Sequence, residues 1–205
     1  MFDFYTNLNF LKKPVEALEA KPVEKGKILF YGHSLFTRWS SAWEHNDLAE
    51  DLRLKDGSLG CINHGFGGST SEDLLYYYYR LVRPYEPRAL VIATGGNDTL
   101  HAIDVDQTLQ NLFRLCHWAH TDFPGIPIYL PEPTPGINMK KNKLPERSHF
   151  GFHRKNYFCQ AIKLYAQTHE NIHVVELWDK PSSSPRAMWA TSARCVTSCS
   201  WKTVI

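Results

Sequence analysis

The sequence has no long hydrophobic run, no strong charge of either sign and no amino-terminal targeting pattern. No apolar stretch approaches the roughly 20 residues that a helix needs to cross a bilayer, so no membrane span is predicted. Residues 1–13 place their lysines after the apolar residues, which is unlike a signal peptide. The formal net charge of +2, without a clustered basic stripe, argues against nucleic acid as a partner.

Cysteines are few, and their spacing excludes a regular disulfide or zinc pattern. The five cysteines are odd in number and widely scattered, which is typical of free thiols, so we expect a reducing, cytoplasmic location. Cys195 and Cys199 have no second pair at metal-ligand spacing, and no metal is expected. We interpret the densest basic patch, at Lys140, Lys141 and Lys143, as a solvated loop.

Short apolar runs alternate with helical patterns along the chain, whose 205 residues suffice for one domain with a sizeable core. The runs predict five buried strands, at residues 27–31, 59–62, 89–93, 126–130 and 172–177. With helices between them, they predict an α/β fold with a parallel sheet covered on both faces. We expect a lead-in over residues 1–26 with a short helix at 15–20, one domain over residues 27–178, and an atypical tail over residues 179–205.

Capping residues and apolar spacing mark the predicted helices. Thr70-x-x-Asp73 predicts a capping box, and the tyrosines at 76–79 predict a helix packed by one face. Asp104 or Asp106 is predicted to cap the next helix, and residues 147–169 carry a third.

Three of the predicted strands end in small or polar residues, within segments 32–34, 63–68 and 95–98. In open α/β sheets the ligand site lies outside the carboxyl ends of the strands, so these loops are expected to meet at one crevice. Ser34 offers a hydroxyl, Gly68 a close backbone N–H and Asn97 an amide donor. A nucleophile with two such donors is the minimum for acyl transfer through an oxyanion.

The same three segments resemble the conserved blocks of the SGNH (GDSL-type) serine hydrolases in order and spacing. Residues 28–34 look like the first block, Asn63-x-Gly65-x-x-Gly68 like the second, and Gly95-x-Asn97-Asp98 like the third. The resemblance spans about residues 27–178 and implies a flavodoxin-like three-layer sandwich that hydrolyses a small-molecule ester without any cofactor. It implies that Ser34 is the nucleophile and that Gly68 and Asn97 form the oxyanion hole.

Two departures from the family pattern bear on activity. His33 stands where the family usually has Asp, and we expect its side chain to point away from the nucleophile. The family's catalytic Asp-x-x-His is missing, since the last Asp is Asp179 and the last His is His173. Our hypothesis is that residues 181–205 replace the normal terminus through truncation or a shifted reading frame. Catalysis is then expected to be impaired, because a serine without a base is a weak nucleophile.

Several further residues are candidates for substrate contact, each with a structural alternative. His33 and His64 would line the crevice or support it, and Asp98 would touch substrate or brace its own loop by hydrogen bonding. His101, in Asp98-x-x-His101, has the spacing of an alternative base. Trp39, which with Trp43 suggests one helix face, would pack in the core or form the wall of an acyl pocket.

Two other classes of function compete with hydrolysis. A non-catalytic relative would bind an acyl or glycan ligand in the same crevice, as the missing Asp-x-x-His suggests. A phosphate binder would use the turn at residues 67–70 before a helix, but no Walker-type lysine follows it. The sequence leaves the oligomeric state open, a homo-oligomer included.

Overall fold

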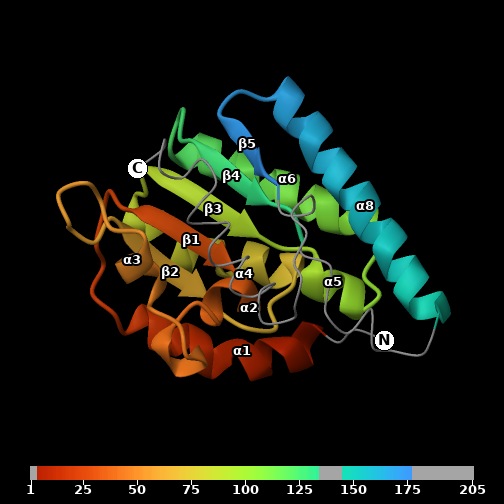
Figure 1. Ribbon diagram of the computed structural model, residues 1–205, viewed down its shortest axis with the longest axis horizontal. Helices are drawn as coiled ribbons and strands as arrows, with labels where there is room; N and C mark the ends of the chain where they lie inside the picture. The colour runs from red at the N-terminus through yellow and green to blue at the C-terminus, as the bar shows by residue number, and fades with distance from the viewer. Residues whose placement is uncertain (1–3, 134–144, 177–205) are drawn as a thin grey trace.

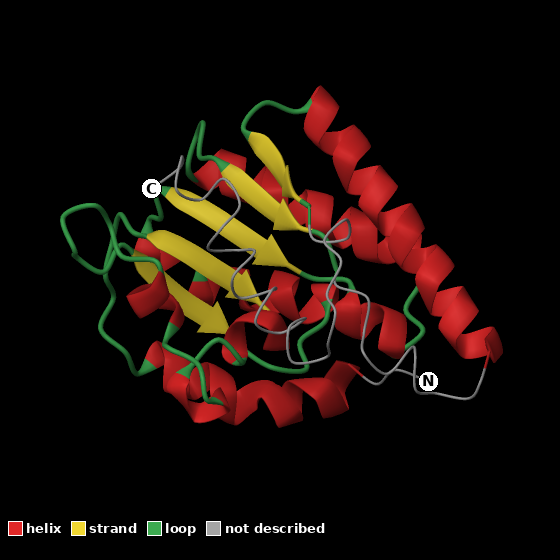
Figure 2. Cartoon of the chain, in the orientation of Figure 1, coloured by secondary structure: helices red, strands yellow, loops and turns green. Residues whose placement is uncertain are grey.

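The computed structural model describes residues 4–133 and 145–176, with side chains over residues 8–133 and 155–176. Five parallel strands form one sheet in the order β2-β1-β3-β4-β5 (Figures 1 and 2). In chain order they are β1 Ile28–Gly32, β2 Cys61–Gly65, β3 Ala89–Ala93, β4 Ile128–Pro131 and β5 Ile172–Val175. The α/β fold with a five-stranded parallel sheet, predicted from the sequence, is confirmed.

Helices lie on both faces of the sheet. Buried side chains of four long helices cover one face, namely α1 Phe4–Glu19, α4 Ser71–Leu81, α6 Val105–Asp122 and α8 Pro145–Thr168. The other face packs against α2 Ser34–Thr37 and α3 Leu48–Asp51. The short helix α5 Gly96–Leu100 follows β3, and two 3-10 turns, Ser41–Trp43 and Arg83–Tyr85, complete the described elements. The sheet is therefore the middle layer of a sandwich.

The predicted capping residues begin the helices that they were assigned to. The Thr70 hydroxyl accepts from the Asp73 amide, and an Asp73 carboxylate oxygen accepts from the Thr70 amide at 2.8 Å. Asp104, rather than Asp106, caps α6 by accepting from the amides of Asp106 and Gln107. In α4, Tyr77 and Tyr78 are buried while Tyr76 and Tyr79 are about half exposed, so the helix packs by one face as predicted.

The amino-terminal segment contains a longer helix than the sequence predicted. Helix α1 has 16 residues and buries Leu11, Val15 and Leu18 against the sheet, at the spacing of one helix face. The sequence predicted a helix only at residues 15–20, whereas α1 starts at Phe4 and contains Pro14. Leu11, Val15 and Leu18 therefore belong to the core that covers this face of the sheet.

Strand β2 extends further than the apolar run that predicted it. It pairs with β1 in parallel up to Gly65, which is opposite Gly32. Asn63 and His64, predicted to lie after the strand, are therefore strand residues whose side chains point to opposite faces. Asn63 donates to the Phe36 carbonyl at 2.9 Å and accepts from the Gly65 amide at 2.9 Å, which ties β2 to α2.

Gly32 allows the end of β1 to lie directly against β3. A Cβ atom at this position would stand 2.5 Å from the Ala93 carbonyl oxygen, closer than any real contact. The close approach brings the first residues after β1 beside the loop that follows β3.

Other expectations can be checked only within the described residues. No helix there is long and apolar enough to cross a membrane, and no cluster of three metal-ligating side chains occurs there. Cys61, Cys116 and Cys159 are buried free thiols. Lys140, Lys141 and Lys143, the pair Cys195 and Cys199, and the tail over residues 179–205 lie outside this part of the chain.

Candidate active site

The loops after β1, β2 and β3 meet at the carboxyl edge of the sheet. A Cβ at Gly67 would stand 3.8 Å from the Ser34 Cβ, so the loops after β1 and β2 touch. A Cβ at Gly96 would stand 3.4 Å from His33 Nε2, which places the loop after β3 on the other side. The three segments expected to share a crevice are thus adjacent.

Ser34 is the first residue of α2 and is half-buried. The preceding His33 has extended backbone and caps the helix, since its Nδ1 accepts from the Leu35 amide at 3.1 Å. Among the side chains of residues 8–133 and 155–176, neither a histidine nor a carboxylate accepts a hydrogen bond from the Ser34 hydroxyl.

His33 caps α2, and a carboxylate at this position could accept the Leu35 N–H in the same way. Burial, followed by the positive charges of Lys155 and Arg38, lowers the pKa of His33 from 6.5 to about 4, so the ring is neutral at pH 7. With Nδ1 accepting, Nε2 carries the ring hydrogen and faces Gly96. His33 therefore acts as a cap and has no lone pair left for the Ser34 proton.

A substitution pair can check the capping role. We expect His33→Ala to lower the free energy of unfolding by about 1 kcal/mol, because the Leu35 amide loses its acceptor. His33→Asp restores an acceptor and is expected to remain within about 0.5 kcal/mol of wild type. Urea unfolding at pH 7 measures both variants, and equal losses in the two would contradict the assignment.

Gly68 and Asn97, the two predicted oxyanion donors, are both linked to Ser69, the first by the chain and the second by a hydrogen bond. Gly68 has φ +90°, a backbone conformation that glycine adopts without strain, and a Cβ there would stand 2.9 Å from a ring carbon of the exposed Phe10, which would have to move. The Asn97 amide donates one hydrogen to the Ser69 carbonyl at 2.8 Å. Its second hydrogen is chemically available for a ligand.

Asp98 lies beneath the loops rather than in the crevice. Its side chain is buried, and its carboxylate accepts from the Ser71 amide at 3.0 Å and the Gly95 amide at 3.2 Å. The Thr94 hydroxyl also donates to it at 3.3 Å, and the Thr108 hydroxyl, which donates to the Asp104 carbonyl at 3.0 Å, lies 3.4 Å away. The carboxylate is thus occupied as a brace, the alternative that the sequence offered, and we do not include it among substrate contacts.

Carboxylates already occupy the start of α4, where a phosphate would have to bind. Asp73 accepts from the Thr70 amide and Asp98 from the Ser71 amide. Two acidic groups repel a phosphate from this turn and take the amides that it would need. The turn at residues 67–70 is therefore unsuited to the phosphate-binding alternative.

His64 is in the core, on the face of the sheet covered by the long helices. It is fully buried, its Nδ1 lies 2.7 Å from the Leu81 carbonyl oxygen, and its ring stands edge-on to Tyr85 with centroids 4.5 Å apart. Strand alternation turns this side chain away from Asn63 and the crevice. His64 is therefore not placed to line a pocket, contrary to that expectation.

Acid is expected to destabilise the fold through His64. Burial lowers the pKa of His64 from 6.5 to about 4, while its hydrogen bond to Leu81 raises it by less. Between these values the unfolded chain binds a proton that the folded chain does not, so stability present above pH 6.5 falls as the pH drops. From pH 7 to pH 5 we expect a loss of about 2 kcal/mol from this residue, measured by urea unfolding. His64→Gln cannot titrate, and an undiminished loss in that variant would contradict the prediction.

Trp39 and His101 also lie outside the immediate site. Trp39 is buried against Phe30 and donates its indole N–H to Asp51 at 2.8 Å, as core packing requires. Trp43 is 52% exposed, so the two tryptophans do not share a helix face. His101 is an exposed residue that caps the end of α5, and the Asp98 carboxylate that would orient it is held by other donors.

Comparison with known proteins decides the family. A sequence model described as the GDSL-like lipase/acylhydrolase family matches residues 30–193. The chain belongs to this family. No curated protein matches the sequence.

Solved structures of a GDSL-like lipase and of two esterases share the fold at low identity. A GDSL-like lipase from Bacteroides thetaiotaomicron superposes with a TM-score of 0.69 at 17% identity, covering 95% of this chain and 98% of the other. A Geobacillus acetyl-xylooligosaccharide esterase variant gives 0.62 at 15% identity, covering 87% and 95%. A family 3 carbohydrate esterase from Clostridium thermocellum gives 0.57 at 15% identity, covering 88% and 98%. The predicted resemblance to GDSL-type hydrolases is thereby confirmed.

Two residues near the GDSL-like site were not found from the sequence. Phe10 comes from α1, and only the fold shows that it stands over Gly68. Lys155 in α8 is buried, which lowers its pKa, and its charge reaches His33. Neither belongs to a motif, so no sequence signal links it to the three loops.

Proposed function

We propose that this GDSL-like chain is a carboxylic-ester hydrolase with Ser34 as its nucleophile. The backbone amides of Ser34 and Gly68 and the side-chain amide of Asn97 would hold the oxyanion. One observation carries the proposal: the Ser34 side chain abuts Gly67 while Asn97 is hydrogen-bonded to the Ser69 carbonyl, so nucleophile and donors share one small region.

In the proposed reaction the Ser34 oxygen bonds to the acyl carbon, and the carbonyl oxygen becomes an oxyanion. Collapse of this intermediate breaks the ester C–O bond, and the alcohol leaves with a proton. Water then cleaves the acyl-serine, releasing the acid and restoring the hydroxyl. Loss of one oxyanion donor typically costs about 3 kcal/mol in the transition state, so Gly68 and Asn97 together would contribute substantially.

The proposed chemistry also needs a general base that accepts the Ser34 proton. Among the side chains that the structure describes, no histidine accepts a hydrogen bond from the Ser34 hydroxyl. His173 is the second residue of β5. It pairs with Tyr129 of β4 and stacks on that ring, so it lies within the sheet rather than in a loop at the sheet's carboxyl edge. The Nδ1 atom of His33 already accepts the hydrogen bond from Leu35 that caps α2. We therefore expect turnover well below that of a complete triad.

The substrate class follows from the family and from the names of the structural neighbours. The family is one of lipases and acylhydrolases, and two neighbours are described as an acetyl-xylooligosaccharide esterase and a carbohydrate esterase. We propose a small-molecule ester, with an acetyl group on a sugar as the first candidate.

Active-site labelling tests the nucleophile. A fluorophosphonate probe is expected to modify the chain, and peptide mass spectrometry is expected to find the adduct on Ser34. An adduct on another serine, with Ser34 unmodified, would overturn the assignment.

The second candidate function is a non-hydrolytic relative that binds an acyl or glycan ligand in the same crevice. The lack of a base beside Ser34 among the described side chains favours it. This alternative predicts saturable binding of an ester with no release of acid at high protein concentration, measured by calorimetry and acetate detection. Turnover that depends on Ser34 would exclude it.

A further inference from the structure

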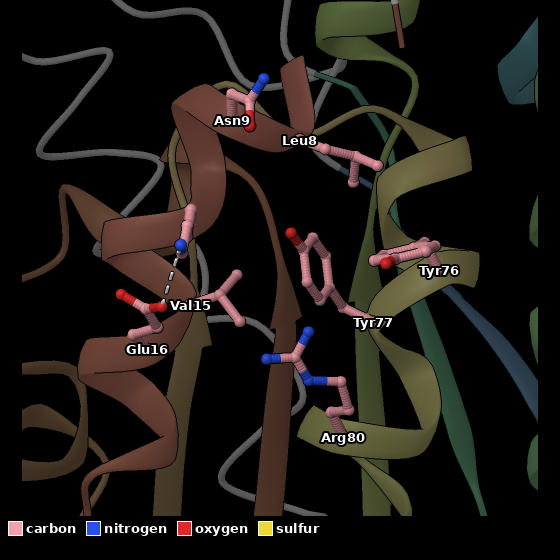
Figure 3. Close-up of a pocket in the computed structure, with 8 residues that line it drawn as sticks. Leu8, Asn9, Val15, Glu16, Tyr76, Tyr77 and Arg80 are labelled. Carbon is pink, nitrogen blue, oxygen red and sulfur yellow. Dashed lines mark ion pairs between the residues drawn. The ribbon is translucent and has the colours of Figure 1, made fainter. Parts of the chain in front are cut away.

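A groove of about 310 Å³ lies between α1 and α4, outside the residues of the candidate active site (Figure 3). Its volume is at the lower end of the range for small-molecule pockets. Asn9, Lys12 and Glu16 line it from α1, while Tyr76, Tyr77 and Arg80 line it from α4. The walls therefore combine aromatic rings with hydrogen-bonding groups of both kinds.

The groove begins beside the candidate oxyanion loop. Phe10 stands over Gly68, and it directly follows Asn9 at one end of the groove. Helix α4 starts at Ser71, shortly after Gly68, and runs along the opposite wall. A molecule held between the two helices would thus extend from the same edge of the sheet where the acyl group is proposed to react.

The charged side chains in the groove are already paired. Lys12 lies 4.0 Å from Glu16, and Arg80 makes two hydrogen bonds to Glu19, at 2.6 and 2.7 Å. Glu19 is not part of the lining, but its carboxylate balances the charge of Arg80, as Glu16 balances that of Lys12. A strongly charged ligand would have to compete with these pairs, so the groove favours a neutral ligand with many hydroxyl groups.

Tyr76 supplies an accessible apolar surface. Its side chain is 53% exposed, and its ring stands perpendicular to that of Tyr77, with centroids 4.8 Å apart. Tyr77 is nearly buried, and the Arg80 guanidinium lies 5.2 Å from its ring centroid. Tyr77 is thus fixed in place as a backing for Tyr76. An exposed ring beside amide and carboxylate groups suits a pyranose, which has an apolar C–H face and a rim of hydroxyls.

We propose that this groove binds an uncharged sugar unit, the part of a glycan ester remote from the reacting acyl group. The inference rests on the proposed function for its biological meaning, although the binding itself does not require catalysis. The Tyr76 ring stacks on the sugar face, and Asn9 and Glu16 hydrogen-bond its hydroxyls.

Calorimetric titration with neutral tetrasaccharides (xylotetraose, cellotetraose and maltotetraose) tests the proposal on the full chain. At least one is expected to bind saturably, and Tyr76→Ala is expected to weaken that binding about tenfold, the loss of one aromatic contact. Tyr76→Phe keeps the ring and is expected to bind like wild type. Tyr79→Ala is the matched control, because Tyr79 is 51% exposed on the same helix and does not line the groove.

Three results would overturn the proposal: no saturable binding of any of these sugars, equal weakening by Tyr76→Ala and Tyr79→Ala, or tighter binding of trigalacturonate than of every neutral sugar. Thermal melts of the variants show whether each is folded. Hydrolysis of p-nitrophenyl acetate, which has no sugar, tests the proposed nucleophile separately from the proposed sugar site. It should survive Tyr76→Ala if Ser34 is the nucleophile, whereas sugar binding should survive Ser34→Ala whether or not the chain is a hydrolase.

Discussion

Replacing Ser34 with alanine is expected to lower kcat/KM for p-nitrophenyl acetate by at least about 100-fold, because the attacking oxygen is removed. The backbone amides of residue 34 and Gly68 remain, as does the Asn97 side chain, so binding of the ester should change little. The loss should therefore fall on kcat more than on KM. Steady-state rates of ester hydrolysis measure both constants.

Ser40→Ala is the matched control for this substitution. Ser40 follows α2 closely, is also partly buried, and donates to the Thr37 carbonyl rather than facing Gly67. Its replacement should leave hydrolysis within twofold of wild type. A Ser34→Ala rate equal to the wild-type rate would show that the Ser34 hydroxyl does not attack the ester. An unchanged rate would therefore favour the ligand-binding alternative.

Asp98→Ala is expected to give the largest loss of stability, about 3 kcal/mol or more, because each buried donor left without an acceptor costs about 1–3 kcal/mol. The amides of Ser71 and Gly95 and the hydroxyl of Thr94 would all lose their acceptor in the protein interior. Urea unfolding measures the change. Since these donors come from two of the three site loops, residual ester hydrolysis should fall with it.

Asp104→Ala provides the comparison for Asp98. Asp104 also accepts from two backbone amides, but it is an exposed helix cap, and its loss should cost about 1 kcal/mol. If the two substitutions destabilised the protein equally, burial of the Asp98 carboxylate would not be the source of its importance.

Local patterns predicted the parts of the fold that short-range physics determines. The runs that became β1 and β3 are continuous and apolar because both faces of a central parallel strand are buried. Thr70 and Asp104 identified helix starts because a cap is satisfied by amides within three residues. Residues whose partners lie close in sequence were thus predictable.

The features that sequence reasoning missed depend on distant partners. Asp98 accepts a hydrogen bond from the amide of Ser71, which is 27 residues away. This contact identifies Asp98 as a residue that braces the loops rather than one that touches substrate. His64 follows a polar residue and precedes glycine, so it looked like a loop residue until pairing with β1 extended the strand through it. Phe10 reaches Gly68 only because α1 packs on α4.

The position of α1 has a practical consequence for handling the protein. Its apolar side seals the sheet, and its Phe10 ring rests on the glycine proposed to hold the oxyanion. A variant that begins after residue 19 would expose the apolar surface that α1 covers. We expect such a variant to aggregate, and not only to bind its ligand more weakly. A rigid fusion partner attached immediately before α1 would lie near the proposed oxyanion hole. A flexible linker between the partner and α1 is therefore advisable.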